Sequence, residues 1–149
     1  MNLNLVNKRV LISGSSSGIG KAIAYHFYKA GSKIVLNGRD IKNLISTKNE
    51  LEGSNFVCGD VSDPFQAEKI IKETVNILGG LDILICNVGS GKSVPPGQEN
   101  FNEWQNSFNK NFYSTTNLIE NSLHHLQKSN GSIVCISSIC GLEVIKNAP

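Results

Sequence analysis

The amino-acid sequence predicts an α/β protein with a doubly wound parallel sheet of about five strands. Short apolar runs typical of strands alternate with longer stretches in which apolar residues recur at helical spacing. The alternation continues through all 149 residues, a length that suits a single domain. A glycine- and serine-rich turn separates the first apolar run from the first helical stretch. This order is typical of parallel sheets in which helices cross over between strands.

The first half of the chain is expected to contribute three strands and two helices. Residues 9–12, 33–36 and 55–58 are the apolar runs. A helix over about residues 18–30 ends before Gly31, because glycine readily takes the backbone conformation that closes a helix. Asp40 is placed to cap a second helix that reaches about residue 51.

The second half is expected to contribute two more strands. Asp63 and Pro64 predict a helix start, since proline suits the first helical position, and Gly79 with Gly80 ends that helix. Residues 82–86 are apolar after the aspartate, as in a strand covered on both faces. A loop over 90–100 leads to a long helix over about 101–128, and a fifth strand follows at 132–136.

Composition and charge exclude several classes of protein. The formal net charge is +2, which is too small to predict a nucleic acid or an anionic membrane as partner. No apolar run reaches the ~18 residues of a membrane span, and the N-terminus lacks the pattern of a secretory signal, so a cytoplasmic protein is expected. The cysteines have no metal-ligand spacing, so no metal site is predicted and buried, reduced thiols are expected; they are Cys58, Cys86, Cys135 and Cys140.

The glycine-rich turn predicts a phosphate-binding site. A helix N-terminus offers unpaired backbone N–H groups and a partial positive charge to an anion. Gly14 allows a tight turn, while Gly18 and Gly20 allow close approach of a ligand and of the strand. A flexible loop without function is the alternative, but strand, turn and helix follow one another in the required order. The residues assigned to this site are Gly14, Ser15, Ser16, Ser17, Gly18, Ile19 and Gly20.

These residues and four later motifs together resemble the short-chain dehydrogenase/reductase family. Its turn reads Thr-Gly-x-x-x-Gly-Ile-Gly, and this chain has Ser13 in the threonine position. Asn87-Val88-Gly89 resembles the family's Asn-Asn-Ala-Gly, with Cys86 and Val88 as departures. The other matches are Asp60-Val61 after the third strand, Asn111 in the long helix and Ser137-Ser138-Ile139-Cys140-Gly141 after the fifth strand.

The resemblance implies a Rossmann fold with strand order 3-2-1-4-5 that binds a nicotinamide cofactor. It implies hydride transfer between that cofactor and a small alcohol or carbonyl substrate, often in a homo-oligomer. Asp60 and Val61 would flank the adenine ring, Asn87 and Gly89 would line the cofactor site, and Asn111 and Ser138 would be catalytic.

The family's catalytic tyrosine and lysine would fall just after Pro149. The chain is therefore expected to be the N-terminal part of such an enzyme, without its C-terminal strands and helices and inactive by itself. The fifth strand would then lie at an edge of the sheet. Tyr25 and Lys29 share the Tyr-x-x-x-Lys spacing, but they belong to the first helix, away from the carboxyl ends of the fourth and fifth strands.

The end of the second strand favours NADP(H) over NAD(H). An acidic residue there would hydrogen-bond the ribose hydroxyls and repel a 2′-phosphate. The chain has Asn37, Gly38 and Arg39 instead, and the Arg39 guanidinium can donate a forked pair of hydrogen bonds to a phosphate. Lys42 supports this assignment, whereas the neighbouring Asp40 opposes it.

Two other functions fit parts of the pattern. The chain could be a nucleotide-binding module without catalysis, which the sequence downstream of residue 149 would decide. An S-adenosylmethionine-dependent methyltransferase also has a glycine turn after its first strand, but it requires an acidic residue at the end of the second strand. Lys92, in the 90–100 loop, could meet an anionic substrate, although a solvated lysine is the commoner case.

Overall fold

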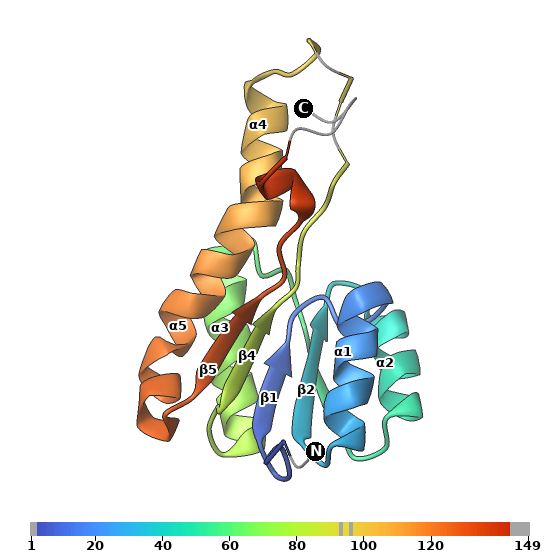
Figure 1. Cartoon of the computed structure of the whole chain (residues 1–149), viewed down its shortest axis with the longest axis vertical. Coiled ribbons are helices and arrows are strands. Elements are labelled where there is room, and N and C mark those ends of the chain that lie inside the picture. Colours follow the sequence, from blue (N-terminus) through green and yellow to red (C-terminus); the bar gives the residue numbers. More distant parts are fainter. Residues whose placement is uncertain (1–2, 93, 96, 144–149) are drawn as a thin grey trace.

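A computed structural model describes residues 3–92, 94–95 and 97–143 as a parallel sheet between two layers of helices (Figure 1). The sheet has five strands in the order β3-β2-β1-β4-β5, and every neighbouring pair is parallel. The predicted fold class and strand order are confirmed. The strands are β1 (Arg9–Ile12), β2 (Lys33–Gly38), β3 (Asn55–Cys58), β4 (Ile83–Cys86) and β5 (Ser132–Cys135).

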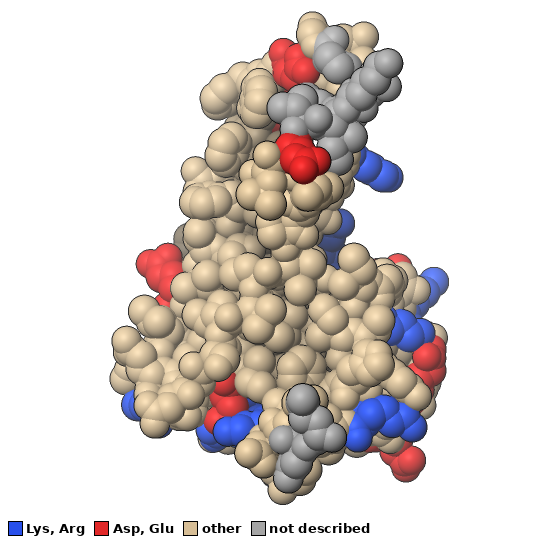
Figure 2. Space-filling view, in the orientation of Figure 1, with Lys and Arg blue, Asp and Glu red and all other residues tan. Residues whose placement is uncertain are grey.

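Helices cover both faces of the sheet. Helices α1 (Gly18–Lys29) and α2 (Ile41–Glu50) pack on one face, and α3 (Pro64–Leu78) and α5 (Ser114–Ser129) pack on the other (Figure 1). Helix α4 (Phe101–Phe108) continues beyond the carboxyl edge of the sheet, and a short 3-10 turn, η2 (Ile139–Gly141), lies at that same end. None of the described helices is long and apolar enough to cross a lipid bilayer. Figure 2 shows the same face in space-filling form, with the charged side chains mainly toward the outline of the molecule.

Two separate apolar clusters hold the layers together. Side chains alternate along β1, so that Val10 and Ile12 pack toward α1 and α2, while Leu11 packs toward α3 and α5. All three are fully buried. Because both faces are covered, the inner strands read in the sequence as continuous apolar runs.

The helix ends follow the residues expected to set them. The Asp40 carboxylate accepts hydrogen bonds from the backbone N–H groups of Lys42 and Asn43 at 2.8 and 3.1 Å. Asp63 caps α3 in the same way, with Pro64 at its first position. Gly79 closes α3 in the left-handed conformation, with φ of 74°. Local capping chemistry therefore fixes these connections.

The predicted long helix contains an interruption. Residues Asn109–Tyr113 form a π-helical segment, η1, between α4 and α5. Before this segment α4 buries no residue, whereas after it α5 buries Ser114, Leu118, Ser122 and Leu126 at four-residue intervals. The helix expected over about 101–128 is thus present as one continuous helical stretch, and it departs from α-helical geometry only at η1. A π-helical turn inside an α-helix often marks a functional position.

An ion pair joins the two central strands at the amino edge of the sheet. Arg9 Nη2 lies 2.7 Å from Asp82 Oδ1, and Arg9 Nε donates to Asp82 Oδ2 at 2.9 Å. Arg9 Nη1 also donates to the Gly79 carbonyl at 2.7 Å. Hydrogen bonds and positive charge from Arg9 outweigh the effect of burial and lower the pKa of Asp82 to about 2.

Strand β5 differs from the inner strands in exposure. Among the described strands it pairs with β4 alone, and Val134 is 44% exposed. The four cysteines are free thiols, but only Cys86 is buried. The prediction of buried thiols is therefore wrong for Cys58, Cys135 and Cys140. The described residues contain no group of three side chains that could hold a metal ion.

Candidate functional site

A groove at the carboxyl edge of the sheet is lined by most of the predicted motifs. It has a volume of about 570 Å³. Its walls are the turn after β1, the ends of β2 and β3, the loop after β4, and η1. The predicted site residues that line it are Gly14, Ser16, Ser17, Gly18, Ile19, Arg39, Asp60, Val61, Asn87 and Gly89.

The turn after β1 presents the start of α1 to this groove. Gly18 has φ of +53°, a conformation that favours glycine, and a Cβ added there would meet no atom within 4 Å. Ser17 is the N-cap of α1, but its side chain makes no capping hydrogen bond, whereas Asp40 and Asp63 cap α2 and α3. The first N–H groups of α1 therefore lack the side-chain oxygen that caps the neighbouring helices, and they suit a phosphate.

Gly20 lies outside the groove lining and serves close packing. A Cβ on this residue would overlap the Gly14 carbonyl and the Asn87 side chain. Asn87 Nδ2 donates to the carbonyls of Ser13 and Gly14 at 3.1 and 3.2 Å, and its backbone N–H donates to Ser13 Oγ at 2.9 Å. Asn87 thus ties the loop after β4 to the turn after β1.

Ser15 also points away from the groove. Its N–H donates to the Asn37 carbonyl at 2.9 Å, and Ser15 Oγ accepts from the Asn37 N–H at 3.0 Å. Asn37 Nδ2 in turn donates to the carbonyls of Val57 and Gly59 at 3.1 and 3.2 Å. These bonds connect the turn, the end of β2 and the end of β3. Ser15 and Asn37 are buried, so they shape the groove from below.

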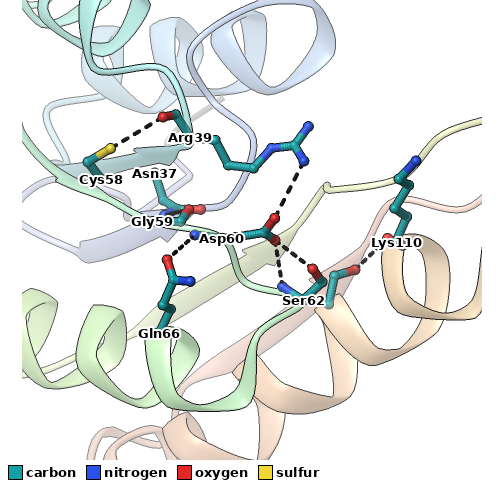
Figure 3. Close-up of polar contacts among 9 residues, drawn as sticks. Asn37, Arg39, Cys58, Gly59, Asp60, Ser62, Gln66 and Lys110 are labelled. Carbon is teal, nitrogen blue, oxygen red and sulfur yellow. Dashed lines mark hydrogen bonds and ion pairs between the residues drawn. The ribbon is translucent and has the colours of Figure 1, made fainter. Parts of the chain in front are cut away.

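Arg39 and Asp60 form an ion pair at the groove (Figure 3). Arg39 Nη1 lies 3.4 Å from Asp60 Oδ2, and the Arg39 side chain is 72% exposed. Asp60 Oδ1 accepts from Ser62 Oγ at 2.7 Å and from the Ser62 N–H at 2.9 Å. Burial acts to raise the pKa of Asp60, but the hydrogen bonds from Ser62 and the charge of Arg39 outweigh it, so the pKa lies below its usual value.

Asn111 lies in η1 and holds the loop after β4. Its Oδ1 accepts from the Ser90 N–H at 2.7 Å, and its Nδ2 donates to the Ser90 carbonyl at 3.1 Å. It lines a second pocket of about 130 Å³ that shares Ser90, Lys92 and Lys110 with the groove. The second pocket is bounded by α4 and by the loop that precedes it, with Glu99, Glu103 and Trp104 among its walls.

Within the described part of the chain, Ser138 does not line the groove. It caps η2, where its Oγ accepts from the Cys140 N–H at 3.2 Å, and it is exposed. Tyr25 and Lys29 do lie together on α1, with the Lys29 ammonium 5.4 Å from the centre of the Tyr25 ring. Neither of these two lines the groove or the second pocket.

Ser62 and Lys110 are among the groove residues that were not singled out in the sequence. Ser62 follows Asp60 by two positions, a spacing typical of a turn stabilised by an aspartate, and this pattern could have indicated it. Lys110 precedes Asn111 in η1 and lines both cavities. No motif marks Lys110, because its orientation depends on the π-helical segment.

Comparison with known proteins identifies relatives of the whole chain. The sequence profile of the short chain dehydrogenase family matches residues 8–149. Hydroxysteroid 11-beta-dehydrogenase 1-like protein A from Xenopus laevis is 37% identical over 140 residues, which are 90% of this chain and 48% of that protein. The 11-beta-hydroxysteroid dehydrogenase-like 2 protein from Arabidopsis thaliana is 38% identical over 143 residues, 91% of this chain and 46% of that protein. The chain thus spans about half the length of these curated relatives.

Solved structures show the same architecture. A short chain dehydrogenase from Burkholderia cenocepacia in complex with NADP superimposes with a TM-score of 0.89. The match covers 97% of this chain and 60% of that one, at 23% sequence identity. The arrangement of sheet and helices is therefore shared even where most side chains differ.

Proposed function

Because the chain belongs to the short-chain dehydrogenase family, we propose that its residues form the cofactor-binding domain of an oxidoreductase that uses NADP(H). The observation that carries this proposal is the end of β2. Arg39 lines the groove there, and the two residues before it, Asn37 and Gly38, carry no carboxylate. A guanidinium there favours a 2′-phosphate, and the absence of an acidic side chain at these positions removes the repulsion of it. The residues expected to hold the dinucleotide are those that line the groove.

In the proposed reaction the cofactor transfers hydride to or from a small alcohol or carbonyl compound. The residues of the chain bind and orient the cofactor. The first N–H groups of α1 balance phosphate charge, and Arg39 contacts the 2′-phosphate. Asp60 and Val61, by resemblance, flank the adenine ring. Asn111 fixes the loop at Ser90, beside the second pocket.

Titration of the chain with NADPH and NADH tests the proposal. We expect tighter binding of NADPH, and we expect Arg39→Ala to weaken NADPH by about 1.5–3 kcal/mol, the value of a charge-assisted contact. NADH affinity should change little. Lys48→Ala is the control, since this lysine is exposed on α2 and does not line the groove. Equal affinities for the two nucleotides in the wild-type chain would contradict the NADP(H) assignment.

A carboxylate introduced at the end of β2 offers a second test. A side chain at Gly38 would meet Ser16 Oγ at 3.0 Å, so Gly38→Asp would place a carboxylate beside the turn after β1. This charge should repel a 2′-phosphate and hydrogen-bond ribose hydroxyls instead. We expect Gly38→Asp to reverse the preference toward NADH. A melting curve checks that the variant is folded, and an unchanged NADPH preference in a folded variant would count against the site.

Nucleotide binding without turnover is favoured for the 149-residue polypeptide by the positions of its tyrosines. Tyr25, Tyr28 and Tyr113 are its three tyrosines, and none of them lines the groove or the second pocket. A positioned proton donor contributes about 100- to 10,000-fold to such a reaction. We therefore expect NADPH binding but no measurable NADPH oxidation with a panel of ketones and aldehydes. Robust oxidation would mean that one of these tyrosines acts as the acid.

A further inference from the structure

Lys110 occupies a wall of the groove on the side away from β2. It lies in η1, and its backbone carbonyl accepts a hydrogen bond from Ser114 Oγ at 2.7 Å, which anchors this part of the π-helical segment to the buried start of α5. Figure 3 shows Arg39 and Lys110 approaching the site from different elements of the chain. Arg39 comes from the end of β2 and Lys110 from η1, and both line the same groove.

The charges of the groove are unbalanced. Its lining contains three cationic side chains, Arg39, Lys92 and Lys110, against one carboxylate, Asp60. Asp60 is already engaged by Arg39 and Ser62. In the part of the chain that the structure describes, the recorded ion pairs do not include Lys92 or Lys110. Lys110 therefore presents its charge to the groove without an ion pair to a described carboxylate, although Glu99 and Glu103 line the second pocket that it also borders.

Lys110 is exposed, and an anionic ligand bound in the groove would complement its charge. Lys110 also borders the second pocket, but Glu99 and Glu103 line that pocket and would repel a substrate carboxylate. The groove side has only Asp60, which faces Arg39. A dinucleotide cofactor carries a pyrophosphate, and a 2′-phosphate adds about −1.5 to −2 charges at neutral pH.

We propose that Lys110 is a second cationic contact for a phosphate of the dinucleotide cofactor, placed on the wall opposite Arg39 by η1. This rests on the proposed function and deepens it. The cofactor would then be held by charge from both walls, with Arg39 on the β2 side and Lys110 on the η1 side. The phosphate concerned is the pyrophosphate or the 2′-phosphate, which have the same chemistry.

Titration of Lys110→Gln with NADPH and NADH tests the proposal. We expect affinity to fall about fivefold, the upper value for an exposed ion pair, and we expect Lys110→Arg to restore most of it. The loss should shrink at high salt, because screening weakens exposed charge pairs. Equal losses for both nucleotides would identify the pyrophosphate, and a loss for NADPH alone would identify the 2′-phosphate.

Lys128→Gln is the matched control. Lys128 lies in the last turn of α5, on the same continuous helical stretch, about 27 Å from Lys110 along the helix axis. Lys128→Gln removes the same charge from the chain, at a distance from Lys110 that is well beyond the Debye length. If Lys110→Gln binds both nucleotides as tightly as Lys128→Gln does, this inference is overturned while the proposed function stands. Failure of the wild-type chain to bind either nucleotide would overturn both.

Discussion

Asn111 and Ser90 exchange two hydrogen bonds, in which the asparagine side chain pairs with the backbone N–H and carbonyl of the serine at 2.7 and 3.1 Å. The pairing joins η1 to the loop after β4, and both of these segments contribute residues to the lining of the second pocket. By resemblance, Asn111 would be the catalytic asparagine. The observed bonds give it a positioning role in addition.

We expect Asn111→Leu to loosen this loop, because leucine can form neither hydrogen bond. The Ser90 backbone is partly exposed and can turn to water, so the free energy of unfolding should fall by only about 1–2 kcal/mol. Hydrogen exchange of the loop amides is the direct measurement. Asn102→Leu is the control, since Asn102 is exposed on α4 and does not line the second pocket. Unchanged exchange at Ser90 would show that the pairing contributes nothing.

Substitution of two glycines separates backbone strain from ligand contact. Gly18 and Gly53 have φ of +53° and +83°, and a Cβ on either would meet no atom within 4 Å. Alanine should therefore destabilise both positions by a similar 1–2 kcal/mol, roughly the cost of the left-handed conformation. Only Gly18 lines the groove. We expect Gly18→Ala, and more strongly Gly18→Val, to weaken NADPH binding, with Gly53→Ala binding normally. Parallel losses in both alanine variants would remove Gly18 from the site.

The Asp82 carboxylate should make the free energy of unfolding depend on pH in the acid range. Its pKa in the folded chain is about 2, below the ordinary value of 3.8. A lowered pKa means that the contribution is complete above about pH 4 and disappears as the pH falls toward 2. The contribution amounts to about 2 kcal/mol at most. Urea unfolding at pH 7 and pH 3 should show a smaller difference for Asp82→Asn than for wild type. NADPH affinity at pH 7 should not change, since Asp82 lies at the opposite edge of the sheet from the groove.

The four thiols should react at different rates. Burial, together with the adjacent Cys135 thiol, raises the pKa of Cys86 to about 12, so very little of this thiol is ionised at pH 8. A thiol reagent at pH 8 should modify the three exposed cysteines rapidly and Cys86 only after unfolding. Cys86→Ala should abolish the slow phase. A fast fourth thiol in the native wild-type chain would contradict the burial of β4.

Features with a local cause could be predicted from the sequence. Asp40, Asp63 and Gly79 act within a few residues of their own positions, so their neighbours in the chain are sufficient to identify them. The glycine turn was identifiable for the same reason, because a strand, a turn and a helix follow in order.

Features that depend on distant contacts could not be predicted. Ser15 and Ser16 are adjacent serines of one turn, yet Ser15 bonds to Asn37 and is buried, and the pairing of β1 with β2 brings Asn37 to it. Exposure of Cys135 depends on the position of β5 in the sheet and not on its apolar sequence. The side-chain direction of Lys110 depends on the π-helical segment.

The π-helical segment η1 is equivalent to one extra residue in an otherwise regular helix. Removing one residue from Asn109–Tyr113 would restore the ordinary helical repeat and rotate all that precedes it by about 100° relative to α5. The buried row of α5 would keep its place, whereas α4 would turn its other side toward the loop after β4, and the pairing of Asn111 with Ser90 would break. The rotation of α4 relative to α5 about the helix axis thus depends on the number of residues in η1. A single deletion here should therefore disrupt the second pocket more than most substitutions of the residues that line it.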